Sequence, residues 1–263
     1  MADRKPRIAV HKFTSCDGCQ LTILDCEEVF VEMTEAVDIE YFMEAKSDFK
    51  PGPYDISFAE GSISTEDEIE RIKLIRASSK TLVALGVCAT EGGIQGLRNY
   101  GDFQAMMHEV YPRPEEVRAL PKSLPYSDFV KIDYALQGCP IDRWQFIALL
   151  TSLLIGKSPL FETGSVCLEC KRKGNVCILV AKAMPCMGPV THTGCGALCP
   201  SYGRDCYACF GPMDDPKPVP LAREFALRGF PHEELVRRFR KITSWAEGFR
   251  KGFEEYEAEA HPS

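Results

Sequence analysis

The chain contains 13 cysteines, and no other residue type in it is so clearly spaced for chemistry. Eight of them lie between positions 167 and 209, which is denser than buried structural cysteines require. An odd number cannot pair completely into disulfides within one chain, and cysteine thiolates are ligands for zinc and iron. Metal ligation is therefore the leading interpretation. The positions are Cys16, Cys19, Cys26, Cys88, Cys139, Cys167, Cys170, Cys177, Cys186, Cys195, Cys199, Cys206 and Cys209.

The first group consists of Cys16-Asp-Gly-Cys19 together with Cys88 and Cys139. Two thiolates three residues apart can bind one metal centre, but a redox dithiol has the same spacing. The two further cysteines favour a centre with four thiolate ligands, and a redox pair remains the alternative. Gly86 and Gly93 near Cys88 lack the Lys-Ser/Thr pair of a phosphate loop. We expect them to let the backbone approach the metal centre.

The second group holds eight cysteines, enough for two centres with four ligands each. Their order along the chain predicts the quartets 167/170/177/186 and 195/199/206/209. Zinc accepts the same ligands, but Pro and Gly crowd these cysteines and leave backbone amides free to hydrogen-bond cluster sulfurs, which favours iron–sulfur clusters. Cys26 lies seven residues beyond Cys19 on one expected helix, about 10.5 Å along its axis. It is too far away to share a cluster, so we expect a buried apolar residue.

Alternating strand and helix patterns must position the first group. Apolar runs predict β-strands at 8–13, 37–42, 54–59, 81–85 and 130–136. Helices are expected at 19–33, 64–79 and 141–155. The second of them should have Ser64 as its N-cap and Asp67 in its first turn. Four prolines predict a long irregular segment over 100–127. This alternation predicts an α/β fold with a doubly wound parallel sheet. Ligands of such sheets bind beyond the carboxyl ends of the strands. Four of those ends are followed by Cys16, Glu60, Cys88 and Cys139.

The composition and the periodicity of the sequence change after residue 156. Residues 160–213 show little periodicity and are rich in Cys, Gly and Pro, so we expect their fold to depend on bound metal. Helices are expected at 221–228 and 233–258. We predict two domains, 1–158 with the first cysteine group and 159–263 with the other eight ligands and the C-terminal helices. The last helix has an apolar stripe that we expect to pack on its own domain, with docking to a partner as the alternative. The stripe comprises Leu235, Phe239, Ile242, Ala246, Phe249, Phe253 and Tyr256.

Charge and hydropathy narrow the function class. The chain has 31 Lys and Arg against 38 Asp and Glu, which gives a net charge of −7. Because it also has no basic run, nucleic acid and anionic membranes are disfavoured as partners. The longest apolar run, 146–155, is far shorter than the roughly 20 residues that span a bilayer. The N-terminus shows no export signal, so we expect a cytoplasmic protein. No Ser-His-Asp arrangement or His-Glu-x-x-His motif supports hydrolysis.

In combination, several motifs resemble the small, electron-transferring subunit of nickel–iron hydrogenases. They cover about residues 7–213: Thr14-Ser-Cys16-Asp-Gly-Cys19, Glu60-Gly-Ser62, Gly86-Val-Cys88, Gly138-Cys139-Pro140 and Pro185-Cys186-Met-Gly-Pro-Val-Thr191. The resemblance implies a flavodoxin-like N-terminal domain plus a small irregular iron–sulfur domain. It implies that the first group holds a proximal 4Fe-4S cluster with Glu60 close by. Three 4Fe-4S clusters would relay electrons between the nickel–iron centre of a separate large subunit and an iron–sulfur/flavin subunit that reduces NAD(P), with no catalytic residue in this chain.

Departures from the family pattern narrow the subgroup. Cys167 stands where membrane-associated members have histidine, and Gly18 and Gly93 stand where oxygen-tolerant members add cysteines. Cys167-Leu-Glu-Cys170 and Cys195-Gly-Ala-Leu-Cys199 most resemble the delta subunit of cytoplasmic, NAD(P)-linked sulfhydrogenases. A methanogen-type cytoplasmic hydrogenase with another acceptor is the nearest alternative, and a non-redox, zinc-stapled scaffold is the alternative from another class. His192 is expected to be a solvated loop histidine, with hydrogen bonding to a cluster sulfur as the alternative.

Overall fold

The computed structural model describes residues 4–260 of the chain. It divides into two compact units, one up to Leu160 and the other from Phe161 onward. In the described residues, no helix combines the length and the apolar character that crossing a membrane requires.

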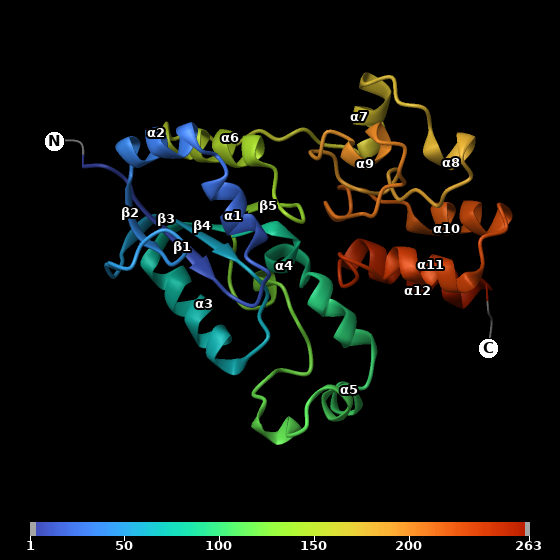
Figure 1. Cartoon of the computed structure of the whole chain (residues 1–263), viewed down its shortest axis with the longest axis horizontal. Helices are drawn as coiled ribbons and strands as arrows, with labels where there is room; N and C mark the ends of the chain where they lie inside the picture. The colour runs from blue at the N-terminus through green and yellow to red at the C-terminus, as the bar shows by residue number, and fades with distance from the viewer. Residues whose placement is uncertain (1–3, 261–263) are drawn as a thin grey trace. The chain divides into compact units, whose positions relative to one another are not determined.

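The first unit is built on one sheet of five parallel strands, in the order β2-β1-β3-β4-β5 (Figure 1). This is the flavodoxin-like order, and it confirms the predicted doubly wound α/β fold. Phe58 of β3 lies opposite Val10 of β1 and Val83 of β4, so large apolar side chains fill the middle of the sheet. The strands are β1 (Arg7–Lys12), β2 (Asp38–Phe42), β3 (Tyr54–Glu60), β4 (Ser79–Leu85) and β5 (Tyr134–Leu136).

Helices cover both faces of this sheet (Figure 1). On one face, Ile23 and Phe146 lie against Val10 and Phe58 of the sheet. On the other face, Ile72 belongs to a buried cluster with residues of β3 and β4. The first face is covered by α1 (Gly18–Leu24), α2 (Glu28–Ala36) and α6 (Arg143–Leu154), and the second by α3 (Glu66–Ser78).

The expected helix over 19–33 is wrong as a single helix. It breaks between α1 and α2, where Glu27 takes a φ of 49°, an unusual conformation for a residue other than glycine. Cys26 lies in this break, 6% exposed, with its Sγ 3.5 Å from the carbonyl oxygen of Thr22. The predicted burial of Cys26 is confirmed, although the helix-spacing argument behind it fails.

The N-cap of α3 is Thr65, one residue later than expected. The Thr65 hydroxyl accepts the N–H of Glu68, and the Glu68 carboxylate accepts the N–H of Thr65, which makes a capping box. The hydroxyl of Ser64 instead lies 3.4 Å from those of Ser62 and Ser123. Ser64, which the sequence pattern favours as the N-cap, therefore takes part in this hydroxyl network and does not cap the helix.

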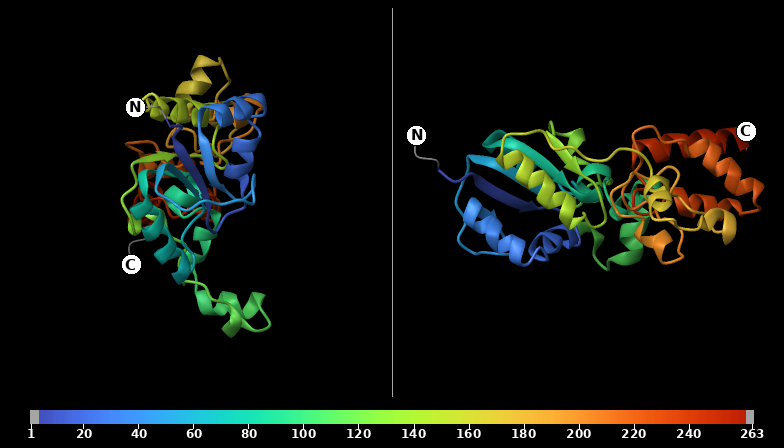
Figure 2. Two further views of the ribbon diagram at one scale, coloured as in Figure 1. Left: turned by 90° about the vertical axis from the view of Figure 1, so that its left-hand side faces the viewer. Right: turned by 90° about the horizontal axis from the view of Figure 1, so that it is seen from above.

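The segment 94–128 is more helical than predicted. It contains α5 (Phe103–Val110) and the short 3₁₀ turns η1 (Ile94–Tyr100), η2 (Pro114–Glu116) and η3 (Tyr126–Asp128). Asp102 caps α5 by accepting the N–H groups of Gln104 and Ala105. Figure 1 and the left-hand view of Figure 2 show the green segment around α5 standing away from the sheet. β5 is also shorter than expected, because the Asp133 carboxylate accepts the N–H of Leu82 and pairs with Arg76.

The second unit consists of cysteine-bearing loops and short helices, followed by three longer helices. The expected helix over 233–258 is wrong as one element, because it breaks between residues 240 and 246. At this break the Thr243 hydroxyl donates to the carbonyl oxygen of Ala208, next to Cys209. The helices are α7 (Val166–Arg172), α8 (Ile178–Ala181), α9 (Leu198–Ser201), α10 (Pro218–Leu227), α11 (His232–Phe239) and α12 (Glu247–Ala260).

The apolar stripe of the C-terminal helices forms the core of this second unit. Phe239 and Phe253 stack with ring centroids 4.9 Å apart, and each is 1% exposed. The same buried cluster includes Val166, Met187 and Val190 from the cysteine-rich segment. Packing of the stripe on its own unit is therefore confirmed for six of its seven residues, since Ile242 is only half-buried and lies outside the cluster. The cysteine-rich segment is not left without an apolar core, because α10, α11 and α12 supply the aromatic side chains of this cluster.

Candidate metal centres

The first four predicted ligands lie beyond the carboxyl ends of three strands. Cys16 is in the loop after β1, and Cys19 is in the first turn of α1. Cys88 is in α4 (Gly86–Glu91), which begins directly after β4, and Cys139 follows β5. Glu60 is the last residue of β3. Since all five strands are parallel, these positions share one edge of the sheet, near the β1/β3 switch point where this fold binds ligands.

Glycines at this edge lie against the cysteine sulfurs. A Cβ atom added to Gly86 would lie 2.5 Å from Cys19 Sγ, and one added to Gly93 would lie 2.5 Å from Cys88 Sγ. Both glycines also have positive φ, +77° and +67°. Any other residue would therefore strain the backbone and displace a sulfur. These glycines bring the backbone close to the sulfurs of two predicted ligands. That they also let it approach a metal centre stays a prediction.

The thiols at this edge are buried and influence one another. Burial, with the neighbouring cysteines adding to it, raises the pKa of Cys19 far above its ordinary range and that of Cys88 to about 12. Burial also raises the pKa of Cys139, with Cys16 adding to the effect. A reactive redox dithiol needs a lowered pKa, which Cys19 does not have. Buried, crowded thiols of this kind suit a bound metal centre, because its positive charge would neutralise the thiolates that form when it displaces their protons.

Glu60 positions the loop around this group. Its side chain is buried, and one carboxylate oxygen accepts the N–H of Cys19 at 3.0 Å while the other accepts from Gln20 Nε2 at 2.8 Å. Burial raises the pKa of Glu60. The carboxylate thus contacts the backbone of a cysteine, and it fixes the start of α1.

Two glutamines contact this site without any signal in the sequence. Gln20 holds Glu60, and Gln95 Nε2 donates to the carbonyl oxygen of Thr14 and to the hydroxyl of Ser62. The thiol of Cys88 lies 3.8 Å from Gln95 Oε1. A single glutamine in a helix or a 3₁₀ turn has no distinctive spacing, so no pattern in the sequence could have identified these two residues.

Two sulfurs of the predicted quartet 167/170/177/186 lie close to Gly188. A Cβ atom on Gly188 would lie 3.4 Å from Cys186 Sγ and 3.6 Å from Cys167 Sγ. Burial, with Cys186, Cys170 and Cys177 adding to it, raises the pKa of Cys167 to about 11. The three other predicted ligands therefore all act on the Cys167 thiol, as expected for a common centre.

Electrostatic contacts join the cysteines of the predicted quartet 195/199/206/209 in pairs. Burial raises the pKa of Cys195, with Cys199 adding to it, and raises that of Cys206 far above its ordinary range, with Cys186 and Cys209 adding to it. That these two pairs share one centre stays a prediction. The backbone N–H of Cys206 donates to Cys186 Sγ at 3.3 Å, which links the two quartets. His192 Nδ1 lies 2.5 Å from the Thr193 carbonyl oxygen, so this nitrogen is engaged by backbone.

All 13 cysteines lie within the described residues and carry free thiols. Over residues 4–260, no three His, Cys, Asp or Glu side chains converge closely enough to hold a single metal ion.

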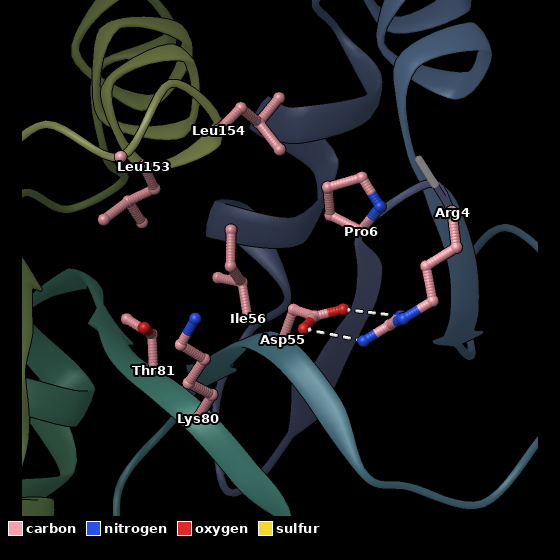
Figure 3. Close-up of a pocket in the computed structure, with 9 residues that line it drawn as sticks. Arg4, Pro6, Asp55, Ile56, Lys80, Thr81, Leu153 and Leu154 are labelled. Carbon is pink, nitrogen blue, oxygen red and sulfur yellow. Dashed lines mark hydrogen bonds and ion pairs between the residues drawn. The ribbon is translucent and has the colours of Figure 1, made fainter. Parts of the chain in front are cut away.

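A pocket of about 330 Å³ opens elsewhere, at the amino-terminal ends of β3 and β4, where Arg4 and Asp55 form an ion pair beside Lys80 (Figure 3). It lies at the opposite edge of the sheet from the cysteines, away from the edge at which doubly wound folds bind ligands.

Comparison with known proteins agrees with this geometry. Residues 16–153 match the family described as NADH ubiquinone oxidoreductase, 20 Kd subunit. The chain is 34% identical to the sulfhydrogenase 2 subunit delta of Pyrococcus furiosus over 239 residues, which cover 91% of this chain and 100% of that one. It is 30% identical to a subunit of the F420-non-reducing hydrogenase vhu of Methanocaldococcus jannaschii over 237 residues, covering 79% and 82%.

Among solved structures, a chain of an NAD+-reducing [NiFe]-hydrogenase in the H2-reduced state has a TM-score of 0.56 and 27% identity. The match covers 60% of this chain and 96% of that one. The family match includes the sheet edge that carries the first four cysteines. The chain therefore belongs to the NADH ubiquinone oxidoreductase 20 Kd subunit family, and within it to the small subunits of hydrogenases.

Proposed function

We propose that this chain relays electrons through three 4Fe-4S clusters, each held by four of its cysteines. The observation that supports the proposal most directly is the gathering of Cys16, Cys19, Cys88 and Cys139 at one edge of the parallel sheet, while Cys26 lies apart in a helix break. We propose that the other eight ligands form two further sets. We assign the set at the sheet edge to a domain of residues 1–158 and the other two to residues 159–263. Bound iron–sulfur clusters would supply one-electron carriers over a wide range of potentials.

Contacts within the second unit support a relay between its two quartets. The N–H of Cys206 points at Cys186 Sγ, and each of these residues belongs to a different quartet. Cys186 and Cys206 are both buried, so solvent is kept away from the contact. A buried N–H that points at a sulfur stabilises negative charge on it and so tunes the potential of that centre.

The partners we propose are a large subunit with the nickel–iron centre and an iron–sulfur/flavin subunit that reduces NAD(P), in the cytoplasm. The names of the Pyrococcus furiosus relative and of the NAD+-reducing hydrogenase support this assignment. The F420-non-reducing relative supports a second candidate, a complex that passes electrons to a different acceptor. Hydrogen-dependent reduction of NAD+ or NADP+ by the purified complex distinguishes the two.

Metal analysis of the anaerobically purified complex tests the clusters. We expect the small subunit to contribute about twelve iron and about twelve acid-labile sulfide, from three 4Fe-4S clusters with four cysteine ligands each. A colourless small subunit with stoichiometric zinc would contradict the proposal and would favour the zinc-stapled scaffold.

A substitution at the sheet edge tests the ligand assignment. Cys88→Ser should remove one cluster and abolish hydrogen-dependent reduction of the acceptor, because Cys88 Sγ belongs to the first quartet. Cys26→Ala is the matched control, since it removes a buried thiol outside every quartet and leaves only a small packing defect. Full iron content in Cys88→Ser, or a lost cluster in Cys26→Ala, would overturn the assignment.

A further inference from the structure

Glu169 lies between two ligands of one quartet, but its carboxylate reaches the loop of the other. It belongs to α7, between Cys167 and Cys170. One carboxylate oxygen accepts the N–H groups of Gly194 and Gly196, each at 3.0 Å. The other oxygen accepts the N–H of Ala197 at 3.0 Å and lies 3.8 Å from Cys195 Sγ.

The loop that Glu169 holds has a shape that needs support. Gly194, Gly196 and Ala197 have φ of +124°, +63° and +49°. N–H groups of such a segment converge and form a site for an anion, which here is the carboxylate. Ala197 is fully buried in the left-handed region, where a residue with a Cβ is strained, so its conformation depends on surrounding contacts.

A second residue of the same segment holds the opposite side of this loop. The Lys173 ammonium, four residues after Glu169, donates to the carbonyl oxygen of Gly196. Glu169 therefore binds donors of the loop while Lys173 binds one of its acceptors. The segment that carries two ligands of one quartet thus shapes the loop that carries Cys195 and Cys199 of the other.

We propose that Glu169 is a positioning residue that shapes the Cys195–Cys199 loop for cluster binding and keeps a negative charge beside Cys195. The inference rests on the proposed function, since it concerns the centre held by 195/199/206/209. Without the carboxylate, three N–H groups lose their acceptor and the loop loses the shape that presents two ligands. With a neutral side chain of the same size, the loop can form, but the nearby negative charge is gone.

The experiment compares Glu169→Ala and Glu169→Gln with a matched control in the whole complex. The control is Glu162→Gln, since Glu162 is an exposed carboxylate of the same unit that pairs only with Arg172 among its described contacts. Three readouts are iron per chain, potentials from redox titrations followed by electron paramagnetic resonance, and hydrogen exchange of the amides at 194, 196 and 197.

In Glu169→Ala, we expect iron to fall by about a third and those amides to exchange roughly tenfold faster, because hydrogen bonds to a charged group are lost. In Glu169→Gln, iron should be largely restored, since the amide oxygen can still accept two of the N–H groups. The potential of one C-terminal centre should then rise, because less negative charge opposes its reduction, while the N-terminal centre and the Glu162→Gln control stay unchanged.

Full iron and unchanged amide exchange in Glu169→Ala would overturn the inference while leaving the proposed function intact. Loss of both C-terminal centres together with rapid exchange throughout α10, α11 and α12 would overturn it too, because Glu169 would then be a general folding residue. A wild-type complex without iron in this chain would instead contradict the proposed function. The exchange of the three amides would still report whether the carboxylate holds the loop.

Discussion

Gly86 lies where any side chain would collide with the sulfur of Cys19, 2.5 Å from the position of an added Cβ. Gly156 has a similar φ, +70° against +77°, but an added Cβ would meet nothing within 4 Å. Both Gly86→Ala and Gly156→Ala should therefore strain the backbone by about 1–2 kcal/mol. Only Gly86→Ala should also lose the N-terminal cluster, which iron analysis and cluster spectra would detect. Equal iron in the two variants would contradict this role of Gly86.

His11 makes folding of the first unit sensitive to pH. It is 5% exposed and lies between the rings of Tyr41 and Tyr54, and its Nε2 has no hydrogen-bond partner. Burial, with a smaller effect of Arg71, lowers its pKa from 6.5 to about 3. The unfolded chain therefore binds this proton at a higher pH than the folded chain. The stability that neutral His11 contributes to the folded unit is complete above pH 6.5 and is lost progressively as the pH falls toward about 3.

The range from about pH 7.5 to about pH 5.5 tests this contribution while avoiding strong acid. As the pH falls over this range, protonation of His11 in the unfolded chain should lower the free energy of unfolding by about 1.4 kcal/mol. His11→Phe, which keeps an aromatic ring between the two tyrosines, should lose correspondingly less in urea unfolding measured at both ends. If wild type and variant lose the same free energy of unfolding, protonation of His11 is not responsible.

At the scale of elements, the sheet was predictable and the ends of the helices were not. Strands such as 81–85 are continuous apolar runs, because both faces of a parallel sheet are buried, so the pattern is strong. The breaks at Glu27 and around Thr243 carry no proline or glycine that would mark them. They depend on tertiary contacts, such as the hydrogen bond from Thr243 to Ala208.

The same contrast holds for the candidate sites. The spacing of cysteines and the ends of strands predicted which residues would gather, because a parallel sheet brings those ends to one edge. The residues that orient them were not predictable. Gln95 binds Thr14, which is 81 positions away in the chain, and Glu169 binds residues 194–197, which are 25 or more positions away. Pairs so distant in the sequence leave no local pattern.

The C-terminal helices stabilise the cysteine-rich segment through Phe253 of α12, which is 1% exposed and stacks on Phe239. Phe253→Ala should cost about 3–5 kcal/mol, because it leaves a large cavity in the core that α7 and the cysteine loops share. Leu227→Ala, on a residue of α10 that is 84% exposed, should change stability by less than about 0.5 kcal/mol. Urea unfolding of the purified complex, followed through cluster absorbance, measures both. A Phe253→Ala variant as stable as Leu227→Ala would contradict this role of the helices.

At the scale of the whole molecule, the two units differ in what holds them together. The first unit has hydrogen-bonded strands and a continuous apolar core. In the second, residues 161–213 contain helices of only seven, four and four residues, α7, α8 and α9. Their apolar residues pack on α10, α11 and α12, but most of the intervening backbone runs in loops between cysteines. If the cysteines hold clusters, the free energy of cluster binding is part of the folding free energy of these loops.

Removal of iron by an anaerobic chelator should therefore affect the two units unequally. Limited proteolysis should cut first between about residues 161 and 213, because most of that backbone runs in loops between cysteines. The sheet of the first unit should stay resistant, because its apolar core holds it together without metal, although its cysteine loops should loosen. Cys170→Ala and Cys206→Ala, one ligand from each C-terminal quartet, should each lose a single, different cluster and become sensitive in this same segment. If both variants lose the same cluster, the ligands interleave between the quartets. If the segment stays resistant after complete removal of iron, packing on α10, α11 and α12 suffices to hold it.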